Sequence, residues 1–280
     1  MTSTMSGARL LADVERSFDG SPDRRLGEVL GAAVRHLHAF VAEVRPSHEE
    51  WKAAIDFLTA VGQRCTDTRQ EFILLSDVLG VSSLVEMAAF AGSEGATENT
   101  VLGPFYVPGS PLRQRGDTIL EGPDGGPPLR VRGRVADLGG QPIAGATVDV
   151  WQNASNGLYA VQDRGQHPHN LRGRFLTGED GVFDFHTVRP VPYPVPDDGP
   201  VGRLLRATGR HAWRAAHIHL LISAPGHRTL TTHLFDAESD YLDSDAVFGV
   251  RDSLVVRFAA DPATGELAAR FDVVLQPAPG

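Results

Sequence analysis

Residues 129–152 read LRVRGRVADLGGQPIAGATVDVWQ, two runs of alternating apolar residues separated by a segment rich in glycine and proline. Alternation with a period of two is typical of strands with one buried face, and Gly and Pro mark the turns between them. Further runs of this kind are GVFDFHTV, HIHLLIS, TLTTHLF, SLVVRF and ARFDVVL. Their number and spacing predict an antiparallel sandwich or barrel.

The first part of the chain has a different period. Up to about residue 91 the apolar residues recur at helical spacing, and one stripe is Leu26, Leu30, Ala33, Val34, Leu37, Phe40, Val41 and Val44. We expect this stripe to form a core face, and a dimer interface is a second role that it could have.

Helix boundaries can be predicted from capping residues. Ser47 and Glu50 match a capping box, which predicts a helix with Trp51, Ile55, Leu58 and Val61 on its inner face. Gly80 is a helix stop, and Ser83 with Glu86 predicts the next start. The fold class predicted is α+β, mainly β, with a helical part over residues 1–100 followed by a β-sandwich part over residues 101–280.

The segment ENTVLGPFYVPGSP, residues 98–111, connects the two halves. It contains three prolines and two glycines and therefore cannot continue a helix.

Composition limits the classes of function. The 280 residues carry a net charge of -9, which disfavours nucleic acids and anionic membrane surfaces as partners. No apolar run reaches the ~18 residues of a membrane span, and the first residues lack the pattern of a signal peptide. The single cysteine, Cys65, excludes an internal disulfide. We therefore expect a cytoplasmic protein with no nucleic-acid partner and no membrane insertion.

Two histidines one residue apart, His217 and His219, lie in HIHLLIS. Successive side chains of a strand point to opposite faces, so both imidazoles face one side and Ile218 faces the other. The pair can bind one metal ion together. The same pattern also fits hydrogen-bonded or surface histidines.

The residues around the pair bear on the kind of metal site. The lack of thiolates and of a His-Glu-x-x-His pattern disfavours zinc. A two-histidine, one-carboxylate iron(II) site usually has an acidic residue near the first histidine, and HAWRAAHIH has none, although Asp184 or Asp236 stays open. Tyr159 and Tyr193 follow strands at the start of loops, a common position for ligands; each could also be a packed aromatic.

Five segments resemble the intradiol ring-cleavage dioxygenases, in the order usual for that family: LGPFYVPGSP, GRVADLGGQPIAGATVDVWQNASNGLYAVQD, FDFHTVRPVPYP, RAAHIHLLISAPGHRTLTTHLF and DYLDSDAVFGVRDSL. The resemblance runs from the helical half to about Phe258. It implies one Fe(III) per subunit, held by Tyr159, Tyr193, His217 and His219. Phenolate is a hard anionic donor that suits a ferric ion, which displaces the phenol proton.

The resemblance also implies roles for residues around the metal. Arg214 would stabilise charge that develops on the substrate ring, and the alternative is a surface arginine. Tyr193 would leave the metal and act as a base when a diol binds. His233 stands where relatives acting on catechol more often carry glutamine, so we interpret it as an orienting partner of a ligand. The pocket would be lined by Leu74, Asp77, Val101, Leu102, Gly103, Pro104, Phe105, Pro192, Arg214 and Val247.

Asp77 bears on the choice of diol. A carboxylate can accept a hydrogen bond from a third ring hydroxyl and would be costly unpaired against catechol. This favours hydroxyquinol, 1,2,4-trihydroxybenzene, cleaved with O2 to maleylacetate in its enol form, 3-hydroxy-cis,cis-muconate. Catechol and chlorocatechol stay alternatives, because an aspartate at a helix end is also explained by the helix itself.

Assembly and two other classes of protein complete the predictions. The resemblance implies a homodimer joined through the N-terminal helices, with a phospholipid bound between them. Residues 133–152 also fit a non-catalytic, transthyretin-like binding module, and a zinc hydrolase is a third class. Neither needs two tyrosines beside the histidine pair, so the set of four separates them from the dioxygenase.

Overall fold

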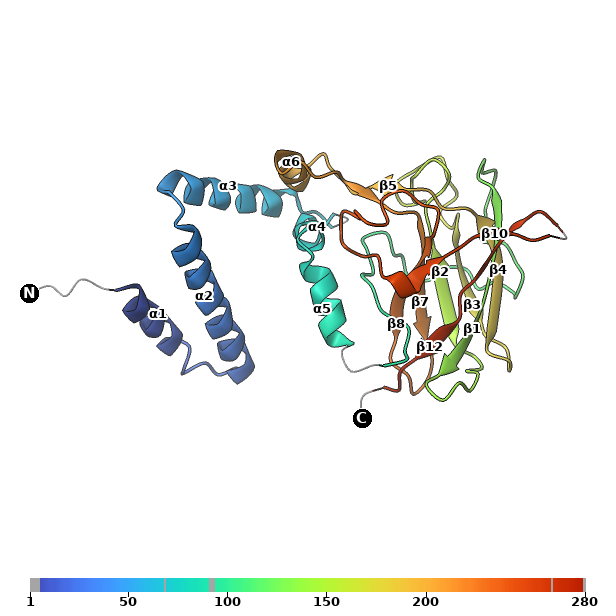
Figure 1. Ribbon diagram of the computed structural model, residues 1–280, viewed down its shortest axis with the longest axis horizontal. Coiled ribbons are helices and arrows are strands. Elements are labelled where there is room, and N and C mark those ends of the chain that lie inside the picture. Colours follow the sequence, from blue (N-terminus) through green and yellow to red (C-terminus); the bar gives the residue numbers. More distant parts are fainter. Residues whose placement is uncertain (1–5, 68, 91–93, 263, 279–280) are drawn as a thin grey trace, which may run out of the picture. The chain divides into compact units, whose positions relative to one another are not determined.

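The structure is a computed structural model that describes residues 6–67, 69–90, 94–262 and 264–278. It divides into two compact units, Met1–Ala60 and Val61–Gly280, and each is described by itself (Figure 1). The predicted domain boundary at residue 100 stays a prediction.

The first unit contains the helices α1 (Gly7–Arg16), α2 (Arg24–Val44) and most of α3 (His48–Arg64). The predicted capping box begins α3: Ser47 N donates to Glu50 Oε2 at 2.7 Å, and Glu50 N donates to Ser47 Oγ at 3.1 Å. The predicted inner face of α3 is wrong for Trp51, Ile55 and Leu58, which are exposed by 43% or more; only Val61 is buried. The apolar stripe of α2 is exposed as well, so these two helices do not bury their apolar faces within their own unit.

Two short helices open the second unit: α4 (Glu71–Val78) and α5 (Val81–Ala89). Gly80 separates them with φ +72°, as its prediction as a stop requires. The predicted start at Ser83 is wrong, because α5 begins at Val81 and the Ser83 hydroxyl instead donates to Val247 O and Phe248 O, both at 3.2 Å.

In the described part of the chain, no single helix is both long enough and apolar enough to span a membrane. The pair α4 and α5 meets both criteria together, with a bend of 79° between the two helices.

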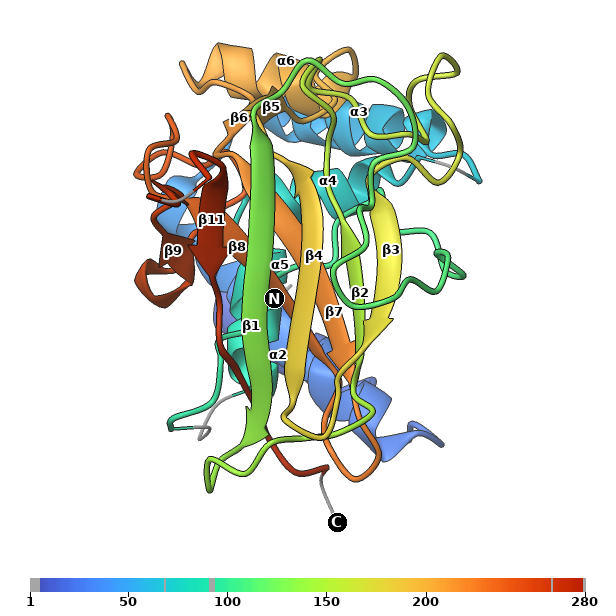
Figure 2. The ribbon, with the colours of Figure 1, turned by 90° about the vertical axis from the view of Figure 1, so that its right-hand side faces the viewer.

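Two five-stranded sheets form the body of the second unit. The first sheet consists of β1 (Pro128–Asp137), β4 (Val182–Val188), β10 (Ala259–Ala260), β11 (Leu267–Arg270) and β12 (Val273–Leu275). The second has the order β3-β2-β7-β8-β9, with β2 (Thr147–Trp151), β3 (Arg172–Leu176), β7 (His217–Ser223), β8 (Leu230–Asp236) and β9 (Val255–Val256). Figure 2 looks onto β1 and β4, with β7 and β8 behind them.

Smaller elements lie between these strands. They are the strand pair β5 (Tyr193–Pro194) and β6 (Trp213–Arg214), the helix α6 (Pro200–Ala207) and the 3-10 helix η1 (Asp252–Leu254). The predicted class, helices followed by a β-rich part, is confirmed. Both sheets are mixed, because β1 pairs in parallel with β11 and β12, and β8 pairs in parallel with β9.

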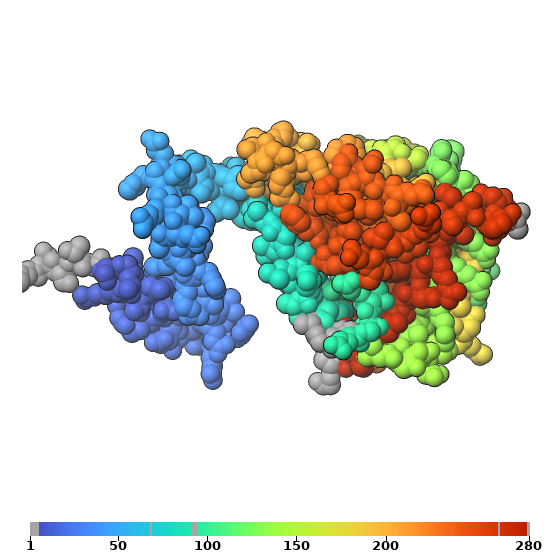
Figure 3. All heavy atoms as spheres, in the orientation of Figure 1, coloured from blue at the N-terminus to red at the C-terminus, as the bar shows by residue number. Residues whose placement is uncertain are grey.

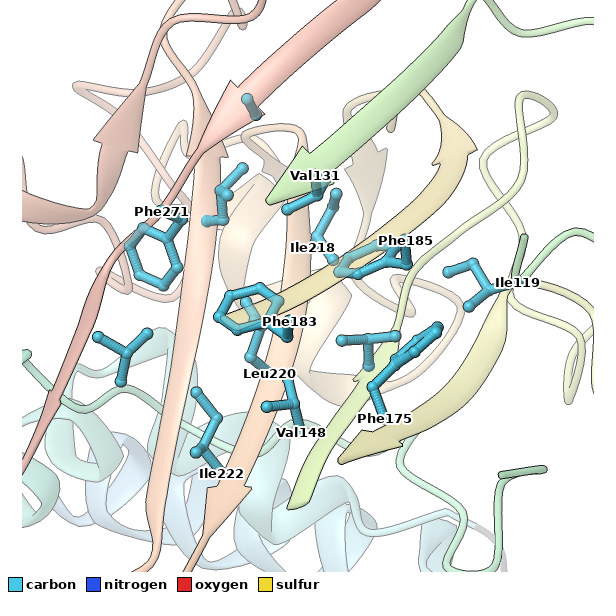
Figure 4. Packing of buried hydrophobic residues seen from close by; sticks show 14 of the residues in the cluster. Ile119, Val131, Val148, Phe175, Phe183, Phe185, Ile218, Leu220, Ile222 and Phe271 are labelled. Atoms are coloured by element: carbon cyan, nitrogen blue, oxygen red, sulfur yellow. The ribbon is translucent and has the colours of Figure 1, made fainter. Parts of the chain in front are cut away.

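The apolar core lies between the two sheets (Figure 4). Val131, Phe183 and Phe185 come from the first sheet, and Val148, Ile218 and Leu220 from the second; all are at most 1% exposed. Alternation along β7 therefore turns Ile218, Leu220 and Ile222 into the core and leaves His217 and His219 on the outer face of the second sheet.

Residues 99–111 and the strand pair β5–β6 lie beside this outer face. The Phe105 carbonyl accepts a hydrogen bond from Arg172 Nη2 at 2.6 Å, and the Tyr106 ring packs on Trp151 with ring centroids 4.9 Å apart. In the space-filling view, the atoms of α4 and α5 continue into the strand region without a break (Figure 3). Trp151, His217 and His219 on the outer face of the second sheet are at most 1% exposed, so this face is covered as the core face is.

Candidate metal centre

On the outer face of the second sheet, the strand register places aromatic and imidazole side chains of neighbouring strands beside one another. His219 on β7 lies opposite Trp151 on β2 and opposite His233 on β8. The Trp151 ring stacks on His219 with centroids 4.7 Å apart and an interplanar angle of 11°. The imidazoles of His217 and His219 are each only 1% exposed, so their orientation depends on protein contacts rather than on water.

Hydrogen bonds at the far nitrogens select the histidine tautomers. His217 Nδ1 lies 2.6 Å from the Ala215 carbonyl, so Nδ1 carries the proton and Nε2 keeps its lone pair. His219 Nδ1 lies 2.8 Å from His233 Nε2. If His219 Nδ1 donates this bond, its Nε2 is also free to bind a metal.

His233 does not aim at the same point as the other two histidines. Its Nε2 is engaged with the far side of His219, and its Nδ1 is buried with no hydrogen-bond partner among the described residues. One ring nitrogen from each of His217, His219 and His233 lies within 4.8 Å of the corresponding nitrogens of the other two, which is close enough for a three-histidine group. The hydrogen bond to His219 Nδ1 nevertheless favours the orienting role for His233.

Tyr159 reaches the centre from the loop that follows β2. The loop turns at Gly157, which has φ +82°, and Tyr159 N donates to Gln162 Oε1 at 3.1 Å. The ring is fully buried and stacks on Phe105 with centroids 4.5 Å apart. This packing directs the Tyr159 hydroxyl to His219 Nε2, at 3.1 Å.

Tyr193 is positioned by the pairing of β5 with β6, which places it directly opposite Arg214. The loop before it is anchored to the end of β2, because Asn153 Nδ2 donates to Val191 O at 2.8 Å. Arg214 Nη1 lies 3.4 Å from the Tyr193 hydroxyl and 3.2 Å from His217 Nε2. The structure therefore brings the four predicted ligands to one buried location.

The donor set fits a ferric ion. The Nε2 atoms of His217 and His219 are 3.2 Å apart, and with both Nδ1 atoms protonated neither Nε2 can donate to the other. In this structure Arg214 Nη1 lies beside one lone pair and the Tyr159 hydroxyl beside the other, and a cation between the two nitrogens can bind both. The two phenol oxygens add the hard anionic donors that Fe(III) prefers.

Burial sets the protonation states of these groups. It lowers the pKa of His217, His219 and His233 well below the ordinary value, and the positive charge of Arg214 adds to the effect. The three imidazoles are therefore neutral, as a metal ligand or its acceptor must be. Burial, with the neighbouring Tyr193, raises the pKa of Tyr159 well above 10, so this phenol ionises only if a metal displaces its proton.

Arg214 is held by a carboxylate that the sequence analysis did not single out. Its Nε donates to Asp245 Oδ1 at 3.1 Å and its Nη2 donates to Oδ2 at 3.3 Å. Burial opposes the charged form, but attraction to Asp245 and Tyr193 outweighs it and raises the pKa of Arg214. The alternative of a surface arginine is wrong, because Arg214 is 3% exposed.

A pocket adjoins the centre and collects most of the predicted lining residues: Leu74, Asp77, Val101, Gly103, Pro104, Phe105, Arg214 and Val247. Among the four predicted ligands, only Tyr193 lines it in the described structure. Leu102 lines a neighbouring surface pocket, and Pro192 lines neither pocket, so their roles stay predictions.

Other wall residues were missed by the sequence analysis: Arg69, Gln70, Glu71, Val195 and Pro196. They carry no metal-ligand or catalytic motif. Arg69 pairs with the buried Glu71, two residues away, and also with Asp198. The pair with Asp198 joins this wall to the segment before α6 and is a contact that is distant in sequence.

Comparison with known proteins identifies the class. A family model described as Dioxygenase matches residues 101–277, and one described as Catechol dioxygenase N terminus matches residues 23–97. The chain belongs to the intradiol ring-cleavage dioxygenase family, for which non-haem iron is typical. This membership decides against the non-catalytic binding module and the zinc hydrolase.

Within this family, the chain is similar to dioxygenases that are named for hydroxyquinol or its chlorinated form. Over 257 residues the chain is 50% identical to the 6-chlorohydroxyquinol 1,2-dioxygenase of Cupriavidus pinatubonensis, with 92% of each chain covered. It is 51% identical over 238 residues to a hydroxyquinol 1,2-dioxygenase of a Rhizobium species, covering 84% of this chain and 80% of that one. The structure of hydroxyquinol 1,2-dioxygenase from Pseudomonas putida DLL-E4 matches with a TM-score of 0.92 at 46% identity, covering 97% of this chain and 99% of that one.

Proposed function

We propose that this chain cleaves hydroxyquinol with O2 between its two adjacent hydroxyl-bearing carbons, giving 3-hydroxy-cis,cis-muconate, the enol form of maleylacetate. The observation that carries the proposal is the meeting of Tyr159, Tyr193, His217 and His219 beside a pocket that contains both Arg214 and Asp77. The names of the relatives support the same substrate class.

One Fe(III) per subunit would be held by His217 Nε2, His219 Nε2 and the oxygens of Tyr159 and Tyr193. When bound, the ferric ion would lower the pKa of the diol and make its ring electron-rich enough to react with O2. Both oxygen atoms of O2 enter the product, since cleavage adds these two atoms to the substrate and releases nothing. His233 would hold His219 in the tautomer that binds metal.

Tyr193 is the proposed base, because it is the ligand that faces the pocket. A hydroxyl of the incoming diol can pass its proton to the Tyr193 oxygen. Arg214 Nη1, 3.4 Å from that oxygen, supplies a fixed positive charge for the anionic diol and for charge that develops on the ring. The surrounding burial excludes water and strengthens this attraction.

Asp77 is the proposed receptor for the third hydroxyl. It lines the pocket, is 6% exposed and has a pKa raised by burial, although Ser82 and Arg214 oppose this rise. A hydroxyl of hydroxyquinol would supply the hydrogen bond that catechol cannot.

Catechol and chlorocatechol are the alternative substrates, and the apolar walls at Leu74, Val101 and Val247 suit an unsubstituted or chlorinated ring. The test compares oxygen uptake by the purified, iron-loaded protein with hydroxyquinol and with catechol, and identifies the products by NMR. We expect kcat/KM for hydroxyquinol to exceed that for catechol by at least ~10-fold, the value of one hydrogen bond to a charged group. Comparable values for the two substrates would contradict the preference.

For the assembly, we propose a homodimer formed by the helical residues 1–100, with a phospholipid bound between the helices, in the cytoplasm. The exposed apolar residues of α2 support the dimer, because patches of this kind mark interfaces.

A further inference from the structure

Asp245 and Arg214 form a buried ion pair at the wall of the pocket. Asp245 is 4% exposed and Arg214 3%, and two hydrogen bonds join them. The bonds come from Nε and Nη2, so the carboxylate lies along one edge of the planar guanidinium. The third nitrogen, Nη1, is left to face Tyr193 and His217.

The backbone around Asp245 is itself fixed. Gly249 N donates to Asp245 Oδ2 at 2.8 Å, and Ala246 N donates to Trp213 O at 3.0 Å, which ties the loop to β6 beside Arg214. A Cβ atom at Gly249 would lie 2.8 Å from Arg214 Nη2 and 3.1 Å from Asp245 Oδ2. Only glycine lets the main chain come this close to the pair.

A second carboxylate makes this pairing consequential. Asp77 lines the same pocket, and attraction to Arg214 is one of the influences on its charge. In the described part of the chain, the Arg214 hydrogen bonds go to Asp245, Tyr193 and His217, and none goes to Asp77. Asp245, and not Asp77, is therefore the carboxylate that pairs with Arg214 in the described structure.

We infer that Asp245 is a positioning residue: it fixes the guanidinium plane of Arg214 so that Nη1 faces the Tyr193 oxygen and the reacting ring. This inference rests on the proposed function, since it acts through Arg214. A charged group displaced by ~1 Å can cost ~10²-fold in rate even when its charge is kept.

The first experiment measures turnover in two variants. Asp245→Glu keeps the charge but moves the carboxylate by one methylene, and Asp245→Asn keeps the size but removes the charge. We expect each to lower kcat for hydroxyquinol by ~30- to 100-fold with a smaller change in KM, because positioning acts on the transition state. Asp243→Asn, at an exposed aspartate in the same loop, should leave kcat unchanged.

The second experiment separates positioning from folding. In a chain that already carries Arg214→Gln, Asp245→Asn should change kcat by less than ~3-fold, since there is no guanidinium left to position. This double variant also lacks an unpaired buried cation, so it folds even if the single variant does not. An equal loss in both backgrounds would overturn the inference.

The third readout does not depend on turnover. Arg214 Nη1 lies beside the Tyr193 oxygen, so displacing it makes that phenolate more electron-rich. The visible tyrosinate-to-iron band of Asp245→Asn should move to longer wavelength, and Arg214→Gln should show no further shift when Asp245→Asn is added. An unshifted band together with wild-type kcat would overturn the inference. A wild-type protein that lacks the band or does not cleave hydroxyquinol would instead overturn the proposed function.

Discussion

At the scale of single residues, the tautomer of His219 links a hydrogen bond to metal binding. His219 Nε2 is a ligand only if Nδ1 donates, and the acceptor within reach is His233 Nε2 at 2.8 Å. The His233 Nδ1 proton then has no partner among the residues that the structure describes, and buried unpaired groups of this kind are uncommon. In the proposed site, this cost is offset by holding His219 in the tautomer that binds metal.

Replacing His233 tests this role. His233→Leu removes the acceptor and should weaken iron binding by ~10- to 100-fold, whereas His233→Gln offers an amide oxygen in its place and should retain most of the affinity. Iron content and the rate of iron loss to a chelator report the difference. Equal iron loss in both variants would contradict an orienting role.

Asp77 connects burial, pH and substrate choice. We expect Asp77→Asn to lower kcat/KM for hydroxyquinol by ~10- to 100-fold and that for catechol by less than ~3-fold, because only the former donates a hydrogen bond to the carboxylate.

Burial raises the pKa of Asp77, so the carboxylate takes up a proton at a higher pH than an exposed aspartate does. In the wild type the preference for hydroxyquinol should therefore decline as the pH falls towards that raised pKa, and in Asp77→Asn it should not depend on pH there.

The sign for stability is the opposite of that for a salt-bridged carboxylate. Because the pKa of Asp77 is higher in the folded than in the unfolded chain, its favourable contribution to folding exists below the unfolded pKa and is lost as the pH rises through the folded one. Asp77→Asn should thus raise Tm at pH 7 more than at pH 4. A lower Tm at pH 7 would mean that the charged form is stabilised in the fold.

At the scale of elements, the connector at residues 98–111 forms part of the site. Gly103 has φ +75°, and a Cβ atom there would lie 3.3 Å from His219 Cε1; Gly109 has φ +86° and open space around it. Gly103→Ala and Gly109→Ala should each lose ~1–2 kcal/mol of unfolding free energy from the left-handed backbone. Only Gly103→Ala should also lower kcat, because it displaces a proposed ligand. Equal kcat in the two variants would show that the connector does not support His219.

The elements also show what can be predicted from sequence. Period-two alternation was sufficient to place His217 and His219 on one face, and the capping box correctly began α3 at its first turn. The helix start predicted from Ser83 and Glu86 was wrong because neither side chain caps the helix. The Ser83 hydroxyl donates to Val247 O, and the Glu86 carboxylate accepts from Asn99 Nδ2. The parallel partners of β1 lie more than 130 residues away, and local patterns carry no information on such pairings.

The same limit applies to the site. The four candidate ligands could be predicted because the family resemblance assigns a role to each of their positions: Tyr159, Tyr193, His217 and His219. Asp245 also lies in a segment that resembles the family, but its contact is with Arg214, 31 residues earlier. Its role depends on a loop packing against β6, which no spacing predicts. Contacts between distant segments are therefore the part that needed the structure.

At the scale of the whole molecule, the apolar face of α2 allows a test of the proposed homodimer. Leu37 and Val41 are 61% and 52% exposed, and they lie one turn apart. If this face joins two copies of the chain, Leu37→Glu with Val41→Glu should convert a dimer into a monomer, measured by light scattering after size exclusion. Ala39→Glu adds charge on another side of the helix and should leave the dimer intact. A wild-type monomer at micromolar concentration would contradict the homodimer.

The proposed function depends most directly on two tyrosines and two histidines binding one ferric ion. The decisive measurement is the visible absorption spectrum of the iron-loaded protein, before and after hydroxyquinol is added without oxygen. We predict a broad red-brown tyrosinate-to-iron band that shifts when the diol binds, and that is altered in Tyr159→Phe and in Tyr193→Phe. An iron-loaded protein without this band would contradict tyrosinate ligation, and with it the site proposed for this chain.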